Sequence, residues 1–269
     1  MSNVRLAAVA GHFYPDDPEE LRQQVCGYLA AAAPLPDVPR PDRPLPDRPL
    51  RAIIVPHAGY VYSGPVAASA YSSLVSARQS VRRVVLLGPS HRVYLKGVAR
   101  STAEAFRTPL GDVPLDEATP VSALSDFRPN DRAHLAEHSI EVHLPFLQVV
   151  LEHFTIVPLV VGDADPEEVD EVIERLSGGP ETLVVVSSDL SHYLDYESAT
   201  RRDRETTLAI EARRTDLAPE QACGSAPING LLHYARRMRL TVTTLDLRNS
   251  GDTAGPRHQV VGYGAYAIH

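Results

Sequence analysis

Four short, continuous apolar runs constrain the fold of this chain more than any other feature. They are Ala52–Val55, Val84–Leu87, Ile156–Val161 and Leu183–Val186. Valine, isoleucine and leucine dominate these runs without alternating polar residues, a pattern typical of strands buried on both faces of a largely parallel sheet. We therefore predict an α/β fold in which helices cover both faces of a mixed, largely parallel sheet.

Helical segments are expected between and after these runs. Asp17 stands three residues before Glu20, which predicts a capped start for the first helix. Further helices are predicted at Pro65–Val75, from Asp165 onwards, at Glu197–Arg214 and at Ile228–Arg239. A last apolar run, Val260–Ile268, contains Gly262 and Gly264, so we predict a strand against which another segment packs closely.

Seven prolines fall between Pro34 and Pro49. Because proline fixes φ and lacks a backbone donor, this stretch suits neither a helix nor a central strand. The segment before it is too short to build a hydrophobic core of its own. We predict one domain over residues 1–269, with a proline-rich surface loop at 34–50.

Charge and composition argue against several classes of partner. The chain has 34 acidic and 26 basic residues and a net charge of −8, opposite in sign to a surface that binds nucleic acid. No run of about 18 apolar residues is present, so no membrane partner is expected. Two cysteines and the lack of a signal-peptide pattern indicate the cytoplasm. Lys96 is the only lysine, which makes Schiff-base chemistry unlikely.

Histidines follow three of the four runs near the points where the strands end. His57 follows the first run and His91 the second, while Asp189 and His192 follow the fourth. The third run ends in Asp163. In open α/β sheets, ligands bind beyond the carboxyl ends of the strands, and imidazole is the commonest metal ligand. One such histidine is as often a hydrogen-bonded structural residue, but two after separate strands favour a site.

Asp189 and His192 are spaced one helical turn apart. The carboxylate could orient a ring nitrogen of the histidine, or it could cap a helix, and both are compatible. Cys223 directly precedes a predicted helix, where a lowered thiol pKa would favour metal binding. The alternative for Cys223, a small buried apolar residue, is the interpretation we prefer for Cys26.

A second histidine cluster spans Glu137–His143. His138 and His143 are five residues apart, so the spacing differs from that of zinc proteases. On a helix, His138 and Glu141 would share a face, and they could support a metal ligand or belong to a plain amphipathic helix. His12 is a weaker candidate. The remaining histidines are expected at the surface or at helix caps: His134, His153, His233, His258 and His269.

Six blocks of the sequence resemble the MEMO family, whose prokaryotic members are also called AmmeMemoRadiSam system protein B. The blocks are Ala10–Pro15, Pro56–Gly64, Leu87–His91, Glu137–Phe146, Ser187–Tyr193 and Gly262–Tyr266. They follow the family's order from Ala10 to the C-terminus. Because genes of such members accompany those of an AMMECR-type protein and a radical-SAM protein, the resemblance implies a functional link to both.

The resemblance also implies a fold similar to that of the LigB-like class III extradiol dioxygenases. It carries over His57, His91 and Cys223 as ligands of one transition-metal ion, with Asp189 and His192 lining the same pocket. The dioxygenase relatives use two histidines and a glutamate. A thiolate in place of that carboxylate puts ring cleavage in doubt, because a softer ligand favours copper or zinc.

These observations lead to a first functional expectation and two alternatives. The first is a metal-dependent redox enzyme that uses iron or copper, with His192 and Asp189 as the acid/base pair and a small molecule as substrate. One alternative is a non-catalytic adaptor that binds a ligand or peptide in the same pocket. The other is a zinc-assisted hydrolase.

Overall fold

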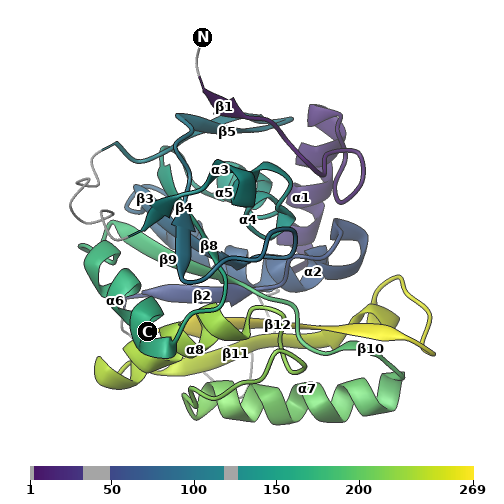
Figure 1. The fold of residues 1–269 in the computed structure, drawn as a ribbon. Coiled ribbons are helices and arrows are strands. Elements are labelled where there is room, and N and C mark those ends of the chain that lie inside the picture. Colours follow the sequence, from purple (N-terminus) through teal and green to yellow (C-terminus); the bar gives the residue numbers. More distant parts are fainter. Residues whose placement is uncertain (1–2, 33–48, 118–126) are drawn as a thin grey trace.

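The computed structural model describes residues 3–32, 49–117 and 127–269, so nearly all of the expected proline-rich loop lies outside the described residues. Within these residues, nine strands form one sheet in the order β10-β12-β2-β9-β3-β8-β4-β7, with β11 beside β12 (Figure 1). Their bounds are β2 Ala52–Val55, β3 Arg83–Pro89, β4 Val98–Arg100, β7 Arg128–Pro129, β8 Thr155–Val161, β9 Thr182–Ser187, β10 His192–Leu194, β11 Val242–Asn249 and β12 Val260–Ile268.

The four apolar runs form the centre of this sheet, as predicted. Strands β2, β9, β3 and β8 are neighbours and run parallel. Antiparallel strands flank them, because β12 pairs with β2 on one side and β4 pairs with β8 on the other. The mixed, largely parallel sheet is therefore confirmed. A three-stranded sheet of β1 Val4–Arg5, β5 Ala105–Thr108 and β6 Gly111–Pro114 was not predicted, since its strands are only two to four residues long.

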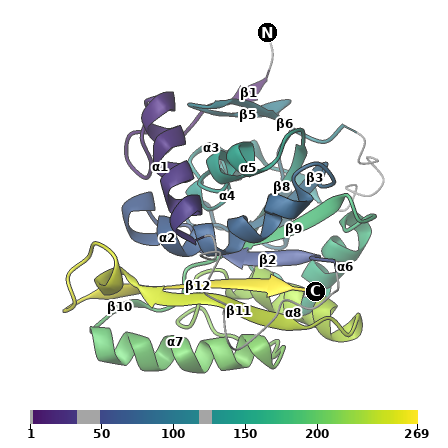
Figure 2. The same cartoon turned by 180° about the vertical axis from the view of Figure 1, so that it is seen from behind.

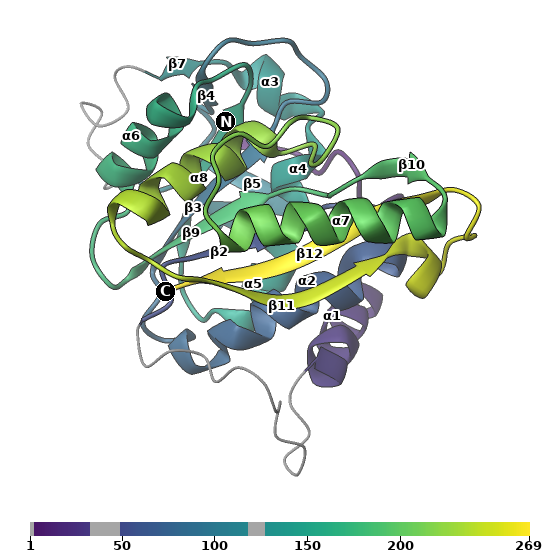
Figure 3. The ribbon, with the colours of Figure 1, turned by 90° about the horizontal axis from the view of Figure 1, so that it is seen from below.

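Helices cover both faces of the large sheet, again as predicted. One face packs against α1 Pro18–Ala32, α2 Tyr60–Tyr71, α4 His138–Glu141 and α5 Leu144–Val150, and the other against α6 Pro166–Leu176, α7 Tyr196–Glu211 and α8 Ser225–Arg237. The remaining helical segments are α3 Asp131–Leu135, η1 Ser72–Ala77 and η3 Ser250–Asp252. Neighbouring residues of a strand serve opposite faces: Ile53 faces the α2 layer and Ile54 the α8 layer. The two layers are seen from behind in Figure 2 and from below in Figure 3.

The first helix starts as predicted, whereas the helix predicted from Pro65 starts five residues earlier. Asp17 accepts hydrogen bonds from the N–H groups of Glu19 and Glu20, which confirms the first cap. Helix α2, however, begins at Tyr60 and contains Pro65 in its interior. Proline leaves the carbonyl of Val61 without an intrahelical donor, and because Val61 is 52% exposed, water can replace that donor.

The close packing predicted at the last strand is present. A Cβ atom on Gly262 would lie 1.9 Å from Oδ2 of Asp203 in α7. Only glycine lets that helix approach β12 so closely. No helix in the described ranges is long and apolar enough to cross a membrane.

Candidate metal centre

The candidate site lies at the carboxyl ends of β2, β9 and β3. The order β2-β9-β3 places the end of β9 between those of the other two strands. Because the three strands are parallel, the segments that follow them emerge at one edge of the sheet. His57, Asp189 and His91 are thus brought together from positions more than 30 residues apart in sequence.

Three imidazoles form the centre of the site. The ring centroid of His57 lies 5.1 Å from that of His91 and 5.3 Å from that of His138. His91 and His138 stack at 4.7 Å with 25° between their planes. One nitrogen from each of the three rings lies within 4.8 Å of the others, so the group could hold a metal ion.

The hydrogen bonds of His57 fix which of its nitrogens can bind a metal. Ser187 Oγ donates to the carbonyl of Ser139 at 2.6 Å, so it accepts from Nδ1 of His57, also at 2.6 Å. The proton of the neutral ring is therefore on Nδ1, and Nε2 carries the free lone pair. His57 is 2% exposed. Burial, and then the neighbouring His91 and His138, lower the pKa of His57 well below its usual value, which favours the neutral ligand form.

A buried carboxylate fixes His91 in the same way. Glu137 Oε1 accepts from Nδ1 of His91 at 2.9 Å, and Oε2 accepts from its backbone N–H at 2.6 Å. With Nδ1 occupied, Nε2 is the ring nitrogen left to meet a metal ion. Burial alone would raise the pKa of Glu137, but hydrogen bonds from His91 and Ser139 outweigh it and lower the pKa to about 2. A carboxylate that holds the outer nitrogen of a histidine is the common arrangement behind metal ligands.

His138 contributes a third ring with an unused nitrogen. Its Nδ1 is buried and has no hydrogen-bond partner among the residues that the structure describes, although Oε1 of Glu137 lies 3.3 Å away. The ring of Phe13 packs against it at 4.9 Å. Burial lowers the pKa of His138 to about 4, so the ring is neutral near pH 7. From the sequence we expected a supporting role for His138, whereas the structure places it in the ring cluster itself.

Cys223 approaches the cluster from the segment before α8. Its Sγ lies 3.3 Å from Nε2 of His57, and the backbone N–H of Asp189 points at the sulfur from 3.3 Å. Zinc–nitrogen and zinc–sulfur bonds of about 2.1 and 2.3 Å would place two such ligands of one ion about 3.1–3.6 Å apart. These atoms therefore fit a shared metal ion.

The thiol pKa expected from the sequence is wrong for the metal-free protein. Burial, followed by the nearby Asp189 carboxyl, raises the pKa of Cys223 to about 12, because a thiolate is poorly solvated there. Deprotonation would then need a bound cation. Cys26, which the sequence assigned to packing, is exposed.

Asp189 and His192 reach the site separately. Asp189 Oδ1 accepts from the backbone N–H of His57 at 2.8 Å, and burial raises the pKa of Asp189 to about 7. His192 begins the extended strand β10, so the expected helical turn is absent between these two residues. Burial lowers the pKa of His192. A hydrogen bond to the backbone of Leu190, rather than to Asp189, acts in the opposite direction and stabilises the protonated ring.

Glu141 lies apart from the hydrogen bonding of the ring cluster. It is fully buried, pairs with Arg5, and accepts from the hydroxyl of Tyr14 and the N–H groups of Ala8 and Val9. It therefore anchors the N-terminal segment.

Among the remaining histidines, the surface or cap positions predicted for His134 and His269 are wrong, since both are buried. His153 and His258 are exposed, as expected. His233, which is partly exposed, pairs with Asp170 on α6 at 2.7 Å.

Two site residues were missed from the sequence, Glu137 and Ser187. Glu137 directly precedes His138 and caps α4 by accepting from the N–H of Ser139, but a carboxylate at such a position usually signals a cap alone. Ser187 ends β9 beside Ser188. Nothing in the local sequence distinguishes a serine that faces His57 from one that ends a strand.

The fold and the ring cluster define the class of this protein, an α/β protein with a candidate metal site at the carboxyl edge of its sheet. The profile of the family described as Memo-like protein matches residues 5–267. A MEMO1 family protein of Sulfolobus acidocaldarius is 37% identical over 281 residues, covering 97% of each chain. Another, of Saccharolobus solfataricus, is 35% identical over 278 residues, covering 96% of this chain and 97% of its own. The chain belongs to the Memo-like family.

A solved structure shares the fold. It is that of an uncharacterized protein from Escherichia coli K12, with a TM-score of 0.51 and 12% identity, and the match covers 82% of this chain and all of the other. At that identity the likeness concerns the fold alone.

Proposed function

We propose that this protein is a metal-dependent redox enzyme whose metal ion is held by His57, His91 and Cys223. The observation that carries the proposal is the convergence of an acceptor nitrogen of His57 with the Cys223 sulfur at 3.3 Å. The ring of His91 lies next to that of His57, with 5.1 Å between the ring centroids, and its Nδ1 is held by Glu137. A ligand set of two imidazoles and one thiolate suits copper, iron or zinc.

The other residues have separate roles in this proposal. A bound iron or copper ion would supply electron transfer to or from substrate. Ser187 and Glu137 hold the outer nitrogens of His57 and His91, so both rings are kept in a fixed orientation. His192 is half-buried, and no carboxylate in the described part of the chain pairs with its ring, so it can exchange a proton with a bound substrate.

Metal analysis tests the ligand assignment first. Protein purified without a chelating tag should retain about one equivalent of transition metal. The double variant His57→Ala, His91→Ala should lose it and stay folded, because neither residue belongs to the hydrophobic core. The variant His233→Ala, which removes a histidine on the opposite helix layer, is the matched control. Equal metal content in the double variant and the control would exclude this site.

Oxygen uptake tests the activity. We expect metal-dependent consumption with a catechol, a thiol or an ascorbate-type reductant. With the substrate that responds, His192→Gln should keep the metal and lose about 10²–10⁴-fold in rate, the usual contribution of acid–base catalysis. Full metal occupancy without turnover on any of the three would favour the ligand-binding adaptor instead.

A zinc-assisted hydrolase is the second candidate, and one observation favours it. His57, His91 and His138 together resemble the three-imidazole sets that hold catalytic zinc with an open position. The variants His138→Ala and Cys223→Ser separate the two arrangements. Loss of zinc in the first variant, with retention in the second, would support the three-histidine set. The reverse result would support the set with Cys223.

A further inference from the structure

A polar cavity lies beside β4, and none of the residues of the ring cluster lines it. It has a volume of about 730 Å³, within the range of small-molecule sites. Its charged and polar lining residues are Lys96, Arg128, Asn130, Asp163, Asp165 and Glu168. Asp163 follows β8, the one central strand whose end is not used by the candidate metal centre.

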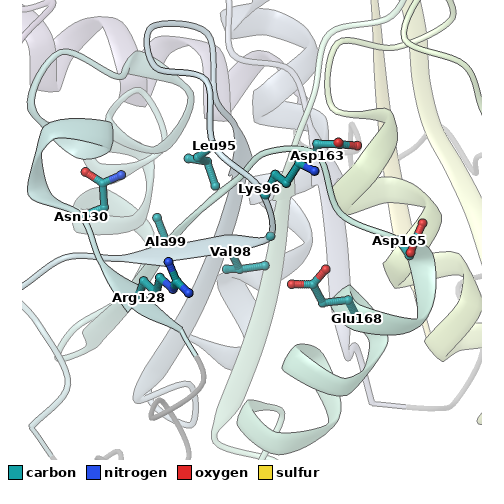
Figure 4. A pocket seen from close by; sticks show the side chains of 10 residues that line it. Leu95, Lys96, Val98, Ala99, Arg128, Asn130, Asp163, Asp165 and Glu168 are labelled. Atoms are coloured by element: carbon teal, nitrogen blue, oxygen red, sulfur yellow. The ribbon is translucent and has the colours of Figure 1, made fainter.

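Arg128 and the carboxylates of Asp165 and Glu168 lie on opposite sides of this cavity, and Lys96 lies beside Asp163. Figure 4 shows Arg128 on one wall and Glu168 with Asp165 on the other, with Val98 between them. Arg128 comes from β7, whereas the two carboxylates come from the start of α6. Across the described part of the chain, Lys96 and Arg128 make no ion pair with any of these carboxylates. The cavity thus presents opposite charges that do not neutralise each other.

Two local features shape the acidic side of this cavity. Asp165 is the N-cap residue of α6, yet its side chain makes no capping hydrogen bond and stays available. Gly97 has a φ of +73°, and a Cβ atom there would lie 2.6 Å from Oε1 of Glu168. Glycine therefore lets this carboxylate rest against the backbone of the cavity wall. Burial, and then the charges of Asp165, Glu171 and Asp163, raise the pKa of Glu168, so a ligand cation would relieve repulsion.

The carboxylates of this cavity do not form a metal site. The metal-compatible cluster found in the described residues is that of His57, His91 and His138, and the oxygens of Asp163, Asp165 and Glu168 are not close enough to one another to form another. A compact ion would therefore not satisfy both walls. A molecule that carries its positive and negative groups at separate ends would.

We propose that this cavity binds a small zwitterion of the amino-acid type. Its ammonium group would lie against Glu168 and Asp165, and its carboxylate against Arg128, where a planar guanidinium can bind it in bidentate fashion. Asn130 lies beside Arg128 and offers an amide donor to the same carboxylate. This proposal does not depend on the metal centre.

Three probes of equal length test the proposal: 6-aminohexanoate, hexylamine and hexanoate. Binding is measured by calorimetry on the full-length protein with a chelator present, so that metal coordination cannot contribute. We expect 6-aminohexanoate to bind about tenfold more tightly than either single-charge probe, since each end adds a charge-assisted contact. Equal binding of hexylamine would show a simple cation site and overturn the proposal. Undetectable binding of all three probes would overturn it as well.

Variants locate the binding. Glu168→Gln should remove the advantage of 6-aminohexanoate over hexanoate, and Arg128→Gln its advantage over hexylamine. Glu167→Gln makes the same charge change one residue away, where the side chain pairs with His233 instead of lining the cavity. An equal loss in Glu167→Gln and Glu168→Gln would reduce the effect to overall charge and refute the assignment.

Discussion

Replacing Glu137 by glutamine should weaken metal binding without removing a ligand. The carboxylate accepts three hydrogen bonds, from the ring and backbone of His91 at 2.9 and 2.6 Å and from the N–H of Ser139 at 3.0 Å. Glutamine has one acceptor oxygen where glutamate has two. Whichever way the amide is turned, its NH₂ group faces an N–H group. If the NH₂ faces the ring, Nδ1 must become the acceptor, and the proton moves to Nε2, where it blocks the metal.

The expected size follows from this exchange. Loss of a carboxylate behind a metal-bound histidine lowers metal affinity about 10–100-fold, or about 1.4–2.7 kcal/mol. Because Glu137 is 1% exposed, the unpaired N–H group should also lower the free energy of unfolding of the metal-free protein by about 1–3 kcal/mol. A competition titration against a chelator measures the first quantity, and urea denaturation measures the second.

Asp170→Asn is the matched control. Asp170 is also a buried carboxylate that holds a histidine, His233 at 2.7 Å, but it lies on α6 in the other helix layer. The Asp170→Asn variant should have a lower free energy of unfolding and the same metal affinity as the wild type. The reasoning about Glu137 fails if its glutamine variant binds metal as tightly as the wild type. It fails equally if Asp170→Asn weakens binding to the same extent.

Three more predictions concern other parts of the chain. In metal-free protein, an alkylating reagent should modify exposed Cys26 before Cys223, whose pKa is about 12, and peptide mapping after timed quenching would reveal the opposite order. The pKa of Asp189 is about 7 in the folded protein against an ordinary 3.8, so its stabilising contribution is complete below about pH 3.8 and is lost as the pH rises through 7. Melting temperatures from pH 5 to 8 should therefore fall less steeply in metal-free Asp189→Asn than in wild type. Gly262→Ala should cost about 1–3 kcal/mol in urea denaturation, since its Cβ would overlap Asp203, and a neutral effect would contradict that packing.

The sequence predicts the centre of this fold because strands buried on both faces need continuous apolar runs. All four runs became central parallel strands, and the strand-end positions of His57 and His91 were enough to bring them to one edge. The flanking strands β4, β7 and β10 are two or three residues long and carry no such pattern. Their pairing depends on neighbours that are distant in sequence.

The finer parts of the site could not be predicted for a related reason. Hydrogen-bond partners such as Ser187 for His57, or Glu137 for His91, join residues 130 and 46 positions apart. The raised pKa of Cys223 depends on burial by the whole fold, which outweighs the local effect of a helix start. Local sequence indicates which side chains are available, and tertiary packing decides which of them meet.

The place of β9 between β2 and β3 has a consequence for the biogenesis of the protein. Those two strands each pair with β9 and are held in register through it. A nascent chain that ends before Thr182 therefore lacks the strand that sets His57 beside His91, and the sulfur of Cys223 is translated later still. The three proposed ligands can therefore meet only after most of the polypeptide has been synthesised, and we expect early translation intermediates to lack the proposed metal centre.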